Sequence, residues 1–261
     1  MKKQRSPIAD PQRKPAKRKK KNLIFRIVLD IIIVGCLLGA AYLYFEPIYR
    51  SYLQDKEEKK HLSEFDSLLS KQSGELLAKV DPNAKPVPGE DYEYYGDDLT
   101  IPEPERDEYG NIILRYEGRI IMPRTKITTL LASDDSLYAL RYSAGRHNPS
   151  PRIEEKGRTV ILGHNFHDRG RVFSRLDEVK VGDDIYVDNL KDRKRYIYKV
   201  YKFDKIYAED LLDRVEETST DNEILLVTCG DEYANGAAIY RMLVYGKLRE
   251  TIPIPADSHI Q

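Results

Sequence analysis

The feature that most constrains this chain is a nearly uninterrupted apolar run at residues 27–45. At about 1.5 Å per residue, a helix of this length reaches across a hydrocarbon core of about 30 Å. Residues 1–22, directly before it, contain ten Lys and Arg and one acid, Asp10, for a formal charge of +9. Positive charge stays on the cytoplasmic side of a membrane. We therefore predict a signal anchor at 23–45, with the tail 1–22 in the cytoplasm and the rest of the chain outside the cell.

Two features bear on how this helix is used. Asp30 lies inside the run, where a carboxylate at mid-bilayer would cost roughly 3 kcal/mol, but it is near enough to the basic end to reach the headgroups. A functional intramembrane Asp is one alternative. A cleaved signal peptide is another, although its apolar core would be shorter and would end at small residues rather than in Tyr-Leu-Tyr-Phe-Glu-Pro. We expect a retained anchor in contact with membrane lipid, and no nucleic acid as a partner of the basic tail.

The composition of the segments after residue 45 indicates how the rest of the chain is organised. Residues 46–80 are charged, with leucines at spacings compatible with a helix, and we predict a helical stalk. A short coiled coil is an alternative, but the apolar positions hold no clean heptad. Residues 81–109 combine five prolines with many acids and tyrosines, which predicts a linker. A catalytic domain at 110–255 and a tail at 256–261 complete the predicted organisation.

Cys229 is the only cysteine outside the apolar run, since Cys36 lies within it. The two cannot easily meet, so Cys229 has no partner for a disulfide. An unpaired exported thiol is either a buried small apolar residue or a reactive nucleophile. A cysteine that follows a hydrophobic strand is more often the former, so the interpretation depends on its neighbours.

Two further predicted strands carry residues suited to this thiol. Residues 158–164 form a run that delivers His164 at its end, and residues 238–248 form another that carries Arg241 on the face opposite Tyr240 and Met242. If these strand ends converge, they supply a nucleophile, a proton-transferring histidine and a cation for the oxyanion. This is the set that a cysteine acyl-transfer enzyme needs.

The domain as a whole is β-rich. Strands are predicted at 112–116, 119–123, 158–163, 184–188, 195–202, 223–228 and 239–248, with a short helix at 137–144. Mostly sequential strands in a domain of about 145 residues favour a closed or nearly closed barrel.

Several stretches, taken in order, carry a family resemblance. A Gly, an apolar run and a Pro at 117–127 are followed by Gly-Arg-Thr-Val-Ile-Leu-Gly-His at 157–164, by 173–176 with 181–187, by Leu-Leu-Val-Thr-Cys at 225–229 and by Tyr-Arg-Met-Leu-Val at 240–244. This ordered set resembles the sortases, membrane-anchored cysteine transpeptidases of Gram-positive bacteria, over residues 112–250. The signature Thr-Leu-x-Thr-Cys has Thr where this chain has Leu225, which we expect to alter packing or substrate fit more than chemistry.

The resemblance implies a fold, a mechanism and partners. The fold is a mainly β, closed eight-stranded sortase-type barrel with short helices. Cys229 would attack an LPXTG-like sorting signal to form a thioacyl enzyme, His164 would transfer protons, and Arg241 would bind the oxyanion or hold the peptide. The implied partners are surface proteins with a C-terminal sorting signal and an amine of a peptidoglycan precursor or another acceptor. No cofactor is implied.

Other polar residues are weaker candidates. Thr228, beside the nucleophile, and His147, after Gly-Arg, are predicted to contact substrate, and an ordinary structural role is the alternative for His147. His167 and Asp168 near His164 do not suggest a metal, because no second set of ligands has zinc-like spacing. Calcium, which some sortases bind, would suit acidic pairs, but such residues are usually only solvated. These pairs are Asp134-Asp135, Asp183-Asp184 and Asp231-Glu232.

Three other functions fit parts of this sequence. A pilus-type sortase, which joins pilin subunits, resembles this chain but typically adds a C-terminal membrane helix and a lid with an Asp-Pro-aromatic motif; here Asp81-Pro82 is followed by Asn83. An L,D-transpeptidase also uses an external cysteine, but its Ser-His-Gly-Cys-x-Arg cluster is absent. A non-enzymatic surface module would need a broken triad, whereas all three residues are present.

Overall fold

The computed structural model describes residues 18–71, 76–82, 103–166, 171–230, 233–234 and 237–254. Most of the tail 1–22, most of the linker 81–109 and the tail 256–261 lie outside the described residues. The chain divides into two compact units, Met1–Ile48 and Tyr49–Gln261, and helix α1 (Arg18–Lys71) contributes to both.

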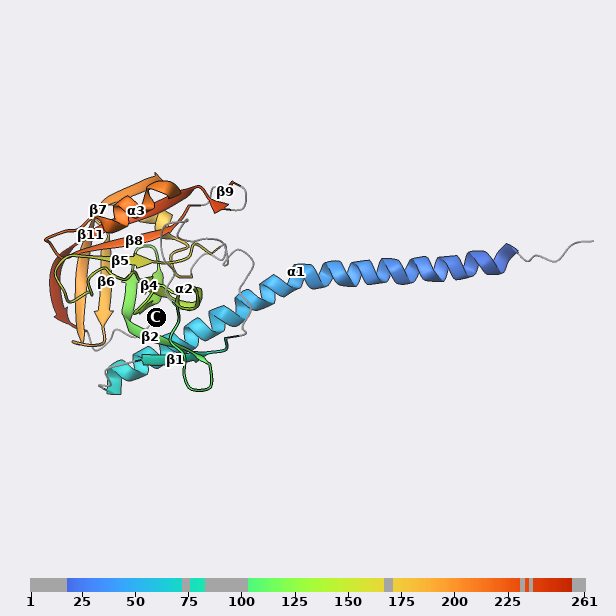
Figure 1. Ribbon diagram of the computed structural model, residues 1–261, viewed down its shortest axis with the longest axis horizontal. Coiled ribbons are helices and arrows are strands. Elements are labelled where there is room, and N and C mark those ends of the chain that lie inside the picture. Colours follow the sequence, from blue (N-terminus) through green and yellow to red (C-terminus); the bar gives the residue numbers. More distant parts are fainter. Residues whose placement is uncertain are drawn as a thin grey trace, which may run out of the picture. The chain divides into compact units, whose positions relative to one another are not determined.

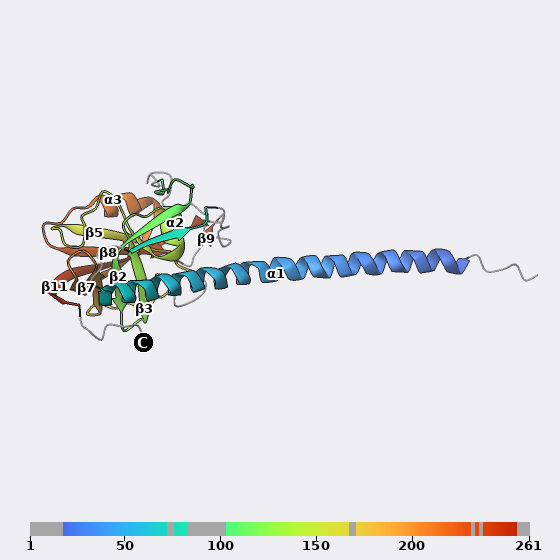
Figure 2. The same cartoon turned by 90° about the horizontal axis from the view of Figure 1, so that it is seen from below.

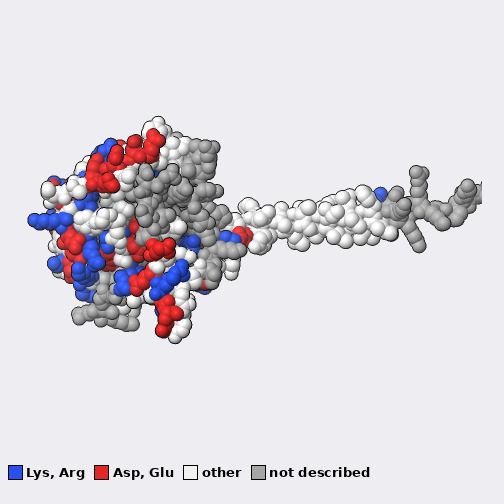
Figure 3. All heavy atoms as spheres, in the orientation of Figure 1, with Lys and Arg blue, Asp and Glu red and all other residues white. Residues whose placement is uncertain are grey.

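The first unit contains the apolar part of α1. Its large side chains are exposed, for example Leu37, Leu38 and Leu43, and Figure 3 shows almost no charged residues along it. Within the part of the chain that the structure describes, this is the one helix long and apolar enough to cross a membrane, with a mean hydropathy of 2.5 in its most apolar window. A helix satisfies its own backbone hydrogen bonds, which is the requirement for a segment placed in lipid. The predicted apolar helix is therefore present.

The second unit is built on a closed sheet. In spatial order its strands are β2 (Ile112–Met122), β3 (Ile127–Ala132), β4 (Ala144–Arg146), β5 (Arg158–Leu162), β8 (Glu223–Cys229), β11 (Tyr240–Pro253), β7 (Lys194–Tyr207) and β6 (Asp184–Asn189). Pairing of β6 with β2 closes the ring of these eight strands (Figure 1). The predicted eight-stranded barrel is confirmed. Neighbouring strands are antiparallel except β3 with β4 and β5 with β8.

Alternation along the strands gives the barrel an inner and an outer apolar face. Side chains from around the ring fill the interior, including Ile120, Ile161, Leu226 and Val244. The outer face of β5, β8 and β11 is also apolar and is covered by α2 (Leu137–Tyr142) and α3 (Leu211–Glu216). Strands β5 and β8 are thus buried on both faces, as parallel pairs usually are.

The predicted helical stalk at residues 46–80 is helical in only part of its length. The helix ends at Lys71, and β1 (Leu76–Val80) is a strand that pairs with β2 (Figure 2). The alternation in β1 of buried and exposed residues is the period of two that a strand requires. Upstream, Leu62 and Phe65 of α1 pack against β1, β2 and α2. The folded unit therefore begins well before residue 110, and no free stalk extends to residue 80.

Arg119 connects this helix to the barrel. It is fully buried, and its guanidinium donates to Asp66 Oδ1 on α1 at 2.5 Å and to Asp188 Oδ2 on β6 at 2.8 Å. Gly118, its neighbour, sits at a bulge between β2 and β3, where an added Cβ would lie 2.5 Å from the Asp188 carbonyl oxygen. The two strands predicted at 112–116 and 119–123 are therefore one strand with a bulge. The remaining short elements are η1 (Leu176–Glu178), η2 (Ala208–Asp210), β9 (Tyr233–Ala234) and β10 (Ala237–Ala238).

Candidate active site

Cys229 is the last residue of β8. Its side chain lies on the outer face of the barrel, two residues beyond Val227, and packs against the apolar cluster of that face. The thiol is free and half-buried. The uninterrupted apolar run before it makes β8 a central strand, so the cysteine is delivered at the edge of a rigid element.

Arg241 lies directly opposite Cys229. The two residues are register partners in the antiparallel pair of β8 and β11, so their side chains emerge on the same face. Arg241 is buried, and its Nη1 donates to the carbonyl oxygens of Ala238 at 2.8 Å and Tyr240 at 3.2 Å. These bonds hold the guanidinium near the thiol. The predicted face of Arg241, opposite Tyr240 and Met242, follows from the same register.

His164 follows the end of β5, on the other side of β8. Leu162 pairs with Val227 in the parallel register, so two residues further on His164 reaches the level of Cys229, on a strand path about 4.8 Å away. Three hydrogen bonds extend this alignment past the end of β5. Gly163 N donates to Val227 O at 3.0 Å, Thr228 Oγ1 to Gly163 O at 2.7 Å, and Asn165 Nδ2 to Cys229 O at 2.9 Å.

Gly163 is required by close packing at this point. A Cβ there would lie 2.4 Å from the ring of Phe173, which fills the barrel interior directly beneath. Phe173 N also donates to His164 O at 3.2 Å. A glycine before the histidine thus lets the segment cross the Phe173 ring without displacing His164.

The electrostatics favour neutral side chains. Burial and, to a smaller extent, the nearby cations Arg141 and Arg171 together lower the pKa of His164 to about 4. Burial raises the pKa of the Cys229 thiol, and the charge of Arg241 opposes this without overcoming it. At neutral pH the resting pair is therefore a thiol and an uncharged imidazole.

The sequence is also similar to known proteins. The model of the sortase domain matches residues 120–249. The chain belongs to the sortase family. Sortase A from Bacillus anthracis is 25% identical over 219 residues, covering 80% of this chain and 88% of that protein.

Solved sortase structures are also similar to the chain. Sortase A from Listeria monocytogenes is 23% identical, with a TM-score of 0.48, and covers 54% of this chain and 92% of its own. Sortase C-3 from Streptococcus pneumoniae is 18% identical, with a TM-score of 0.48, and covers 77% and 86%. Sortases are membrane-anchored cysteine transpeptidases that act on surface proteins with sorting signals.

The two residues predicted to contact substrate in this sortase occupy other positions. Thr228 is fully buried and its hydroxyl bonds Gly163, so it joins the ends of β8 and β5. His147 N donates to Val160 O, which places His147 about 13 Å along the strand from His164. Its Nδ1 lies 2.6 Å from Asp135 Oδ2, and both groups are buried. We therefore assign neither Thr228 nor His147 to substrate binding.

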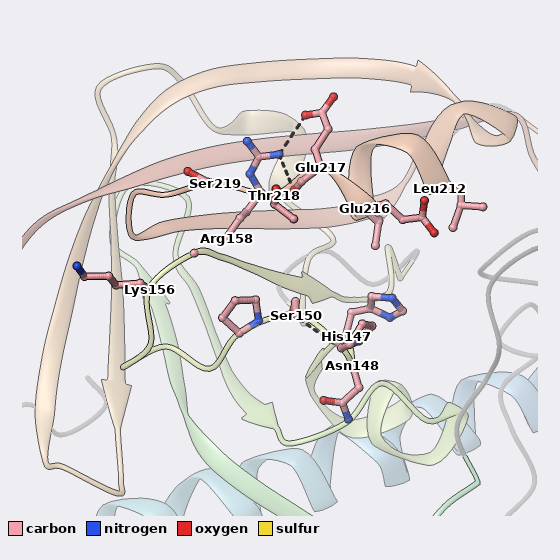
Figure 4. Close-up of a pocket in the computed structure, with 14 residues that line it drawn as sticks. His147, Asn148, Ser150, Lys156, Arg158, Leu212, Glu216, Glu217, Thr218 and Ser219 are labelled. Atoms are coloured by element: carbon pink, nitrogen blue, oxygen red, sulfur yellow. Dashed lines mark hydrogen bonds and ion pairs between the residues drawn. The ribbon is translucent and has the colours of Figure 1, made fainter.

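His147 lines a pocket of about 600 Å³ at the opposite end of β5 from His164. Figure 4 shows His147 near Leu212 and Glu216 of α3 at one end of this pocket and Lys156 toward the other. Arg158, at the start of β5, is paired there with Glu217 at 3.1 Å. The residues that line the pocket do not include Cys229, His164 or Arg241.

The acidic pairs considered for calcium are mostly engaged with protein groups. Asp135 pairs with His147, Asp183 with Arg124 and Asp184 with Lys199. Among the described residues, no group of three potential metal ligands is found. His167, Asp168, Asp231 and Glu232 lie outside the described residues.

The sequence interpretation missed three residues beside the site: Asn165, Arg141 and Arg171. Asn165 immediately follows His164, and an amide next to a strand-end histidine was an available signal. The two arginines come from α2 and from the segment after residue 170, and nothing in their local sequence indicates proximity to His164.

Proposed function

We propose that this chain is a sortase that cleaves an LPXTG-like sorting signal and transfers the surface protein to a cell-wall amino group. The observation that supports it most is the alignment of Cys229 between Arg241 on β11 and His164 after β5. A nucleophile, a proton carrier and a fixed cation then share one end of the sheet. This is the arrangement that acyl transfer through a thioester requires.

In the first half-reaction, the Cys229 sulfur attacks the carbonyl carbon of the scissile peptide bond. The thiol proton passes to His164, and the oxyanion that forms is stabilised by Arg241. Collapse breaks the C–N bond, and His164 gives its proton to the departing amine. A thioester on Cys229 is left, with an uncharged imidazole.

In the second half-reaction, an amine of the acceptor attacks the thioester carbonyl. His164 takes the proton that this amine loses and gives it to the departing Cys229 sulfur as the C–S bond breaks, which restores the thiol and the uncharged imidazole. The new amide joins the surface protein to the acceptor. One histidine thus serves both halves, which is consistent with its position beside the sulfur.

The pKa values bear on which protonation state reacts. A site could depress the thiol pKa, or it could work through a small ionised fraction. Here burial raises the pKa of Cys229 and lowers that of His164. We infer that the enzyme rests as a neutral pair and reacts through a minority thiolate–imidazolium form.

Mass spectrometry of the chain with a panel of sorting peptides tests the proposal. We expect an acyl adduct on Cys229 and cleavage of one peptide class, both lost in Cys229→Ala. Cys36→Ser, which leaves the second unit unchanged, is the matched control and should retain the adduct. A Cys229→Ala protein that still turns over peptide would remove Cys229 from the nucleophile role.

The acceptor is identified by adding amines to the same assay. Transfer to a peptidoglycan-type amine supports the cell-wall role. Transfer only to a lysine side chain of a folded pilin would instead support the pilus-type alternative.

A further inference from the structure

Arg171 is a buried cation that the mechanism above does not use. It is 6% exposed. Its Nε donates to Glu58 Oε2 at 3.2 Å, its Nη1 to Gln54 Oε1 at 3.4 Å, and its Nη2 to the Arg141 carbonyl oxygen at 3.4 Å. Arg171 therefore ties α1 and α2 to the segment that follows the catalytic histidine.

Two residues of α1 hold this guanidinium. Gln54 and Glu58 are four residues apart, so they lie on one face of the helix, and both are buried. Burial raises the pKa of Glu58 to about 7, although Arg171 opposes the shift. A buried ion pair repays its desolvation poorly, so stability by itself is a weak reason for this arrangement.

On its other side, Arg171 contacts the surroundings of His164. Its Cζ lies 4.1 Å from the centroid of the Phe166 ring, and that ring lies 5.3 Å from the His164 ring. The next residue, Val172, is buried at a φ of 42°, a conformation that a β-branched residue rarely adopts. Backbone of this kind persists only where the surrounding contacts hold it in place.

We propose that Glu58 and Gln54 of α1 are positioning residues for His164, acting through Arg171 and Phe166. The carboxylate and amide hold the guanidinium over the Phe166 ring, and Phe166 limits the rotation of the imidazole. The helix next to the apolar segment is then part of the active-site support. This inference rests on the role of His164 in the proposed function.

The test compares four variants of the full chain in detergent micelles. Glu58→Gln and Arg171→Gln remove one charge each, Arg171→Lys keeps the cation, and Glu57→Gln is the same change on the solvent face of the same helix, where the side chain is 43% exposed. We measure kcat and KM with a sorting peptide. The pKa of His164 is measured separately by NMR, without substrate.

In Glu58→Gln and Arg171→Gln we expect kcat to fall on the order of tenfold with KM unchanged, because the imidazole is less well aligned. The pKa of His164 should rise in both, since the cation beside it is released or removed. Arg171→Lys should lie nearer to the unchanged chain, and Glu57→Gln should match it. A purely structural role for Glu58 would lower the unfolding temperature and leave the pKa of His164 unchanged.

The proposal is overturned if Glu58→Gln gives the same kcat and His164 pKa as Glu57→Gln. If Glu58→Gln does not fold, Arg171→Gln decides, because an unchanged kcat and an unshifted His164 pKa in that variant also overturn the proposal. Should the unchanged chain cleave no sorting peptide, the proposed function fails, and the His164 titrations still decide the positioning role.

Discussion

At the scale of single residues, burial at the site reduces the ionisation of the two groups that must react. Cys229 and His164 both sit where water is largely excluded, which disfavours a thiolate and an imidazolium alike. The same exclusion strengthens the attraction between the two ions once they form, and between Arg241 and an oxyanion. A thiol is a much weaker nucleophile than a thiolate, so a largely neutral resting state lowers the reactivity of Cys229.

Arg241 is expected to act through its shape as well as its charge. Arg241→Lys keeps the positive charge opposite Cys229 but loses the planar guanidinium, whose Nη1 donates to two backbone carbonyl oxygens. Loss of an oxyanion donor of this kind costs roughly 3 kcal/mol, so kcat/KM should fall on the order of a hundredfold.

Arg249 is the matched control on the same strand. Its side chain is 61% exposed, so Arg249→Ala should leave kcat/KM nearly unchanged. Steady-state kinetics with one sorting peptide compare the two variants. Wild-type rates in Arg241→Lys combined with an inactive Arg249→Ala would mean that the oxyanion role belongs elsewhere on β11.

The pH dependence of kcat/KM should show a broad plateau. The proposed cycle needs one proton shared by Cys229 and His164. Activity is lost on the acid side when His164 takes up a second proton, near pH 4 rather than near its ordinary 6.5. It is lost on the basic side above the ordinary thiol value of 9.0, because the Cys229 pKa is raised. Initial rates at low peptide concentration measure both limbs, and an acid limb near 6.5 would contradict the burial of His164.

The positions of Cys229, His164 and Arg241 were predictable because each lies at or near the end of a recognisable strand in the sequence. Their alignment was not, since it depends on the pairing of β5 with β8, whose residues are 65 positions apart in the chain. Thr228 illustrates the limit. Its adjacency to Cys229 suggested contact with substrate, whereas the alternation of a strand turns it to the opposite face, against Gly163.

At the scale of elements, the end of α1 is as much a part of the folded unit as the strands. Phe65 is fully buried, contacts the guanidinium of Arg119 and packs in the cluster under β1 and β2. The sequence showed leucines in this part of α1. Their spacing did not indicate whether the apolar face of the helix packs against another element. The same period suits a free amphipathic helix and a docked one.

Phe65→Ala should therefore lower the free energy of unfolding of the second unit by about 3 to 5 kcal/mol, the usual cost of removing a buried phenylalanine. Leu53→Ala, on the same helix where the side chain is 41% exposed, should cost far less. Urea unfolding followed by circular dichroism compares the two. Equal midpoints for both variants would show that α1 is not docked in solution.

Strand prediction succeeded where the apolar alternation was long and failed where it was short. The runs that became β5, β6, β7, β8 and β11 were found, with ends displaced by a few residues. β3 and β4 were missed, and β4 has only three residues and contains Gly145. That glycine is needed because a Cβ would lie 2.4 Å from the Asp134 carbonyl oxygen. In the sequence, a single glycine such as Gly145 indicates a turn.

At the scale of the whole molecule, the two units call for different surroundings. The second unit buries its apolar residues in three clusters and presents a surface of mixed charge. The first unit exposes its apolar side chains along the helix, an arrangement that is stable only in lipid or in another apolar environment. We propose that residues 23–45 span the membrane, with residues 1–22 on the cytoplasmic side.

The proposed orientation rests on where the charge lies, and it predicts a topology. Ten Lys and Arg residues precede the apolar run, and moving them across the membrane would be far more costly than leaving them inside. A reporter fused after Gln261 should therefore be active only if it requires the cell exterior, and the protein should stay with the membrane fraction after a carbonate wash. Moving the basic residues of 1–22 to the other end of the helix should reverse the reporter result. A processed soluble form that lacks residues up to about 45 would instead identify the segment as a cleaved signal peptide.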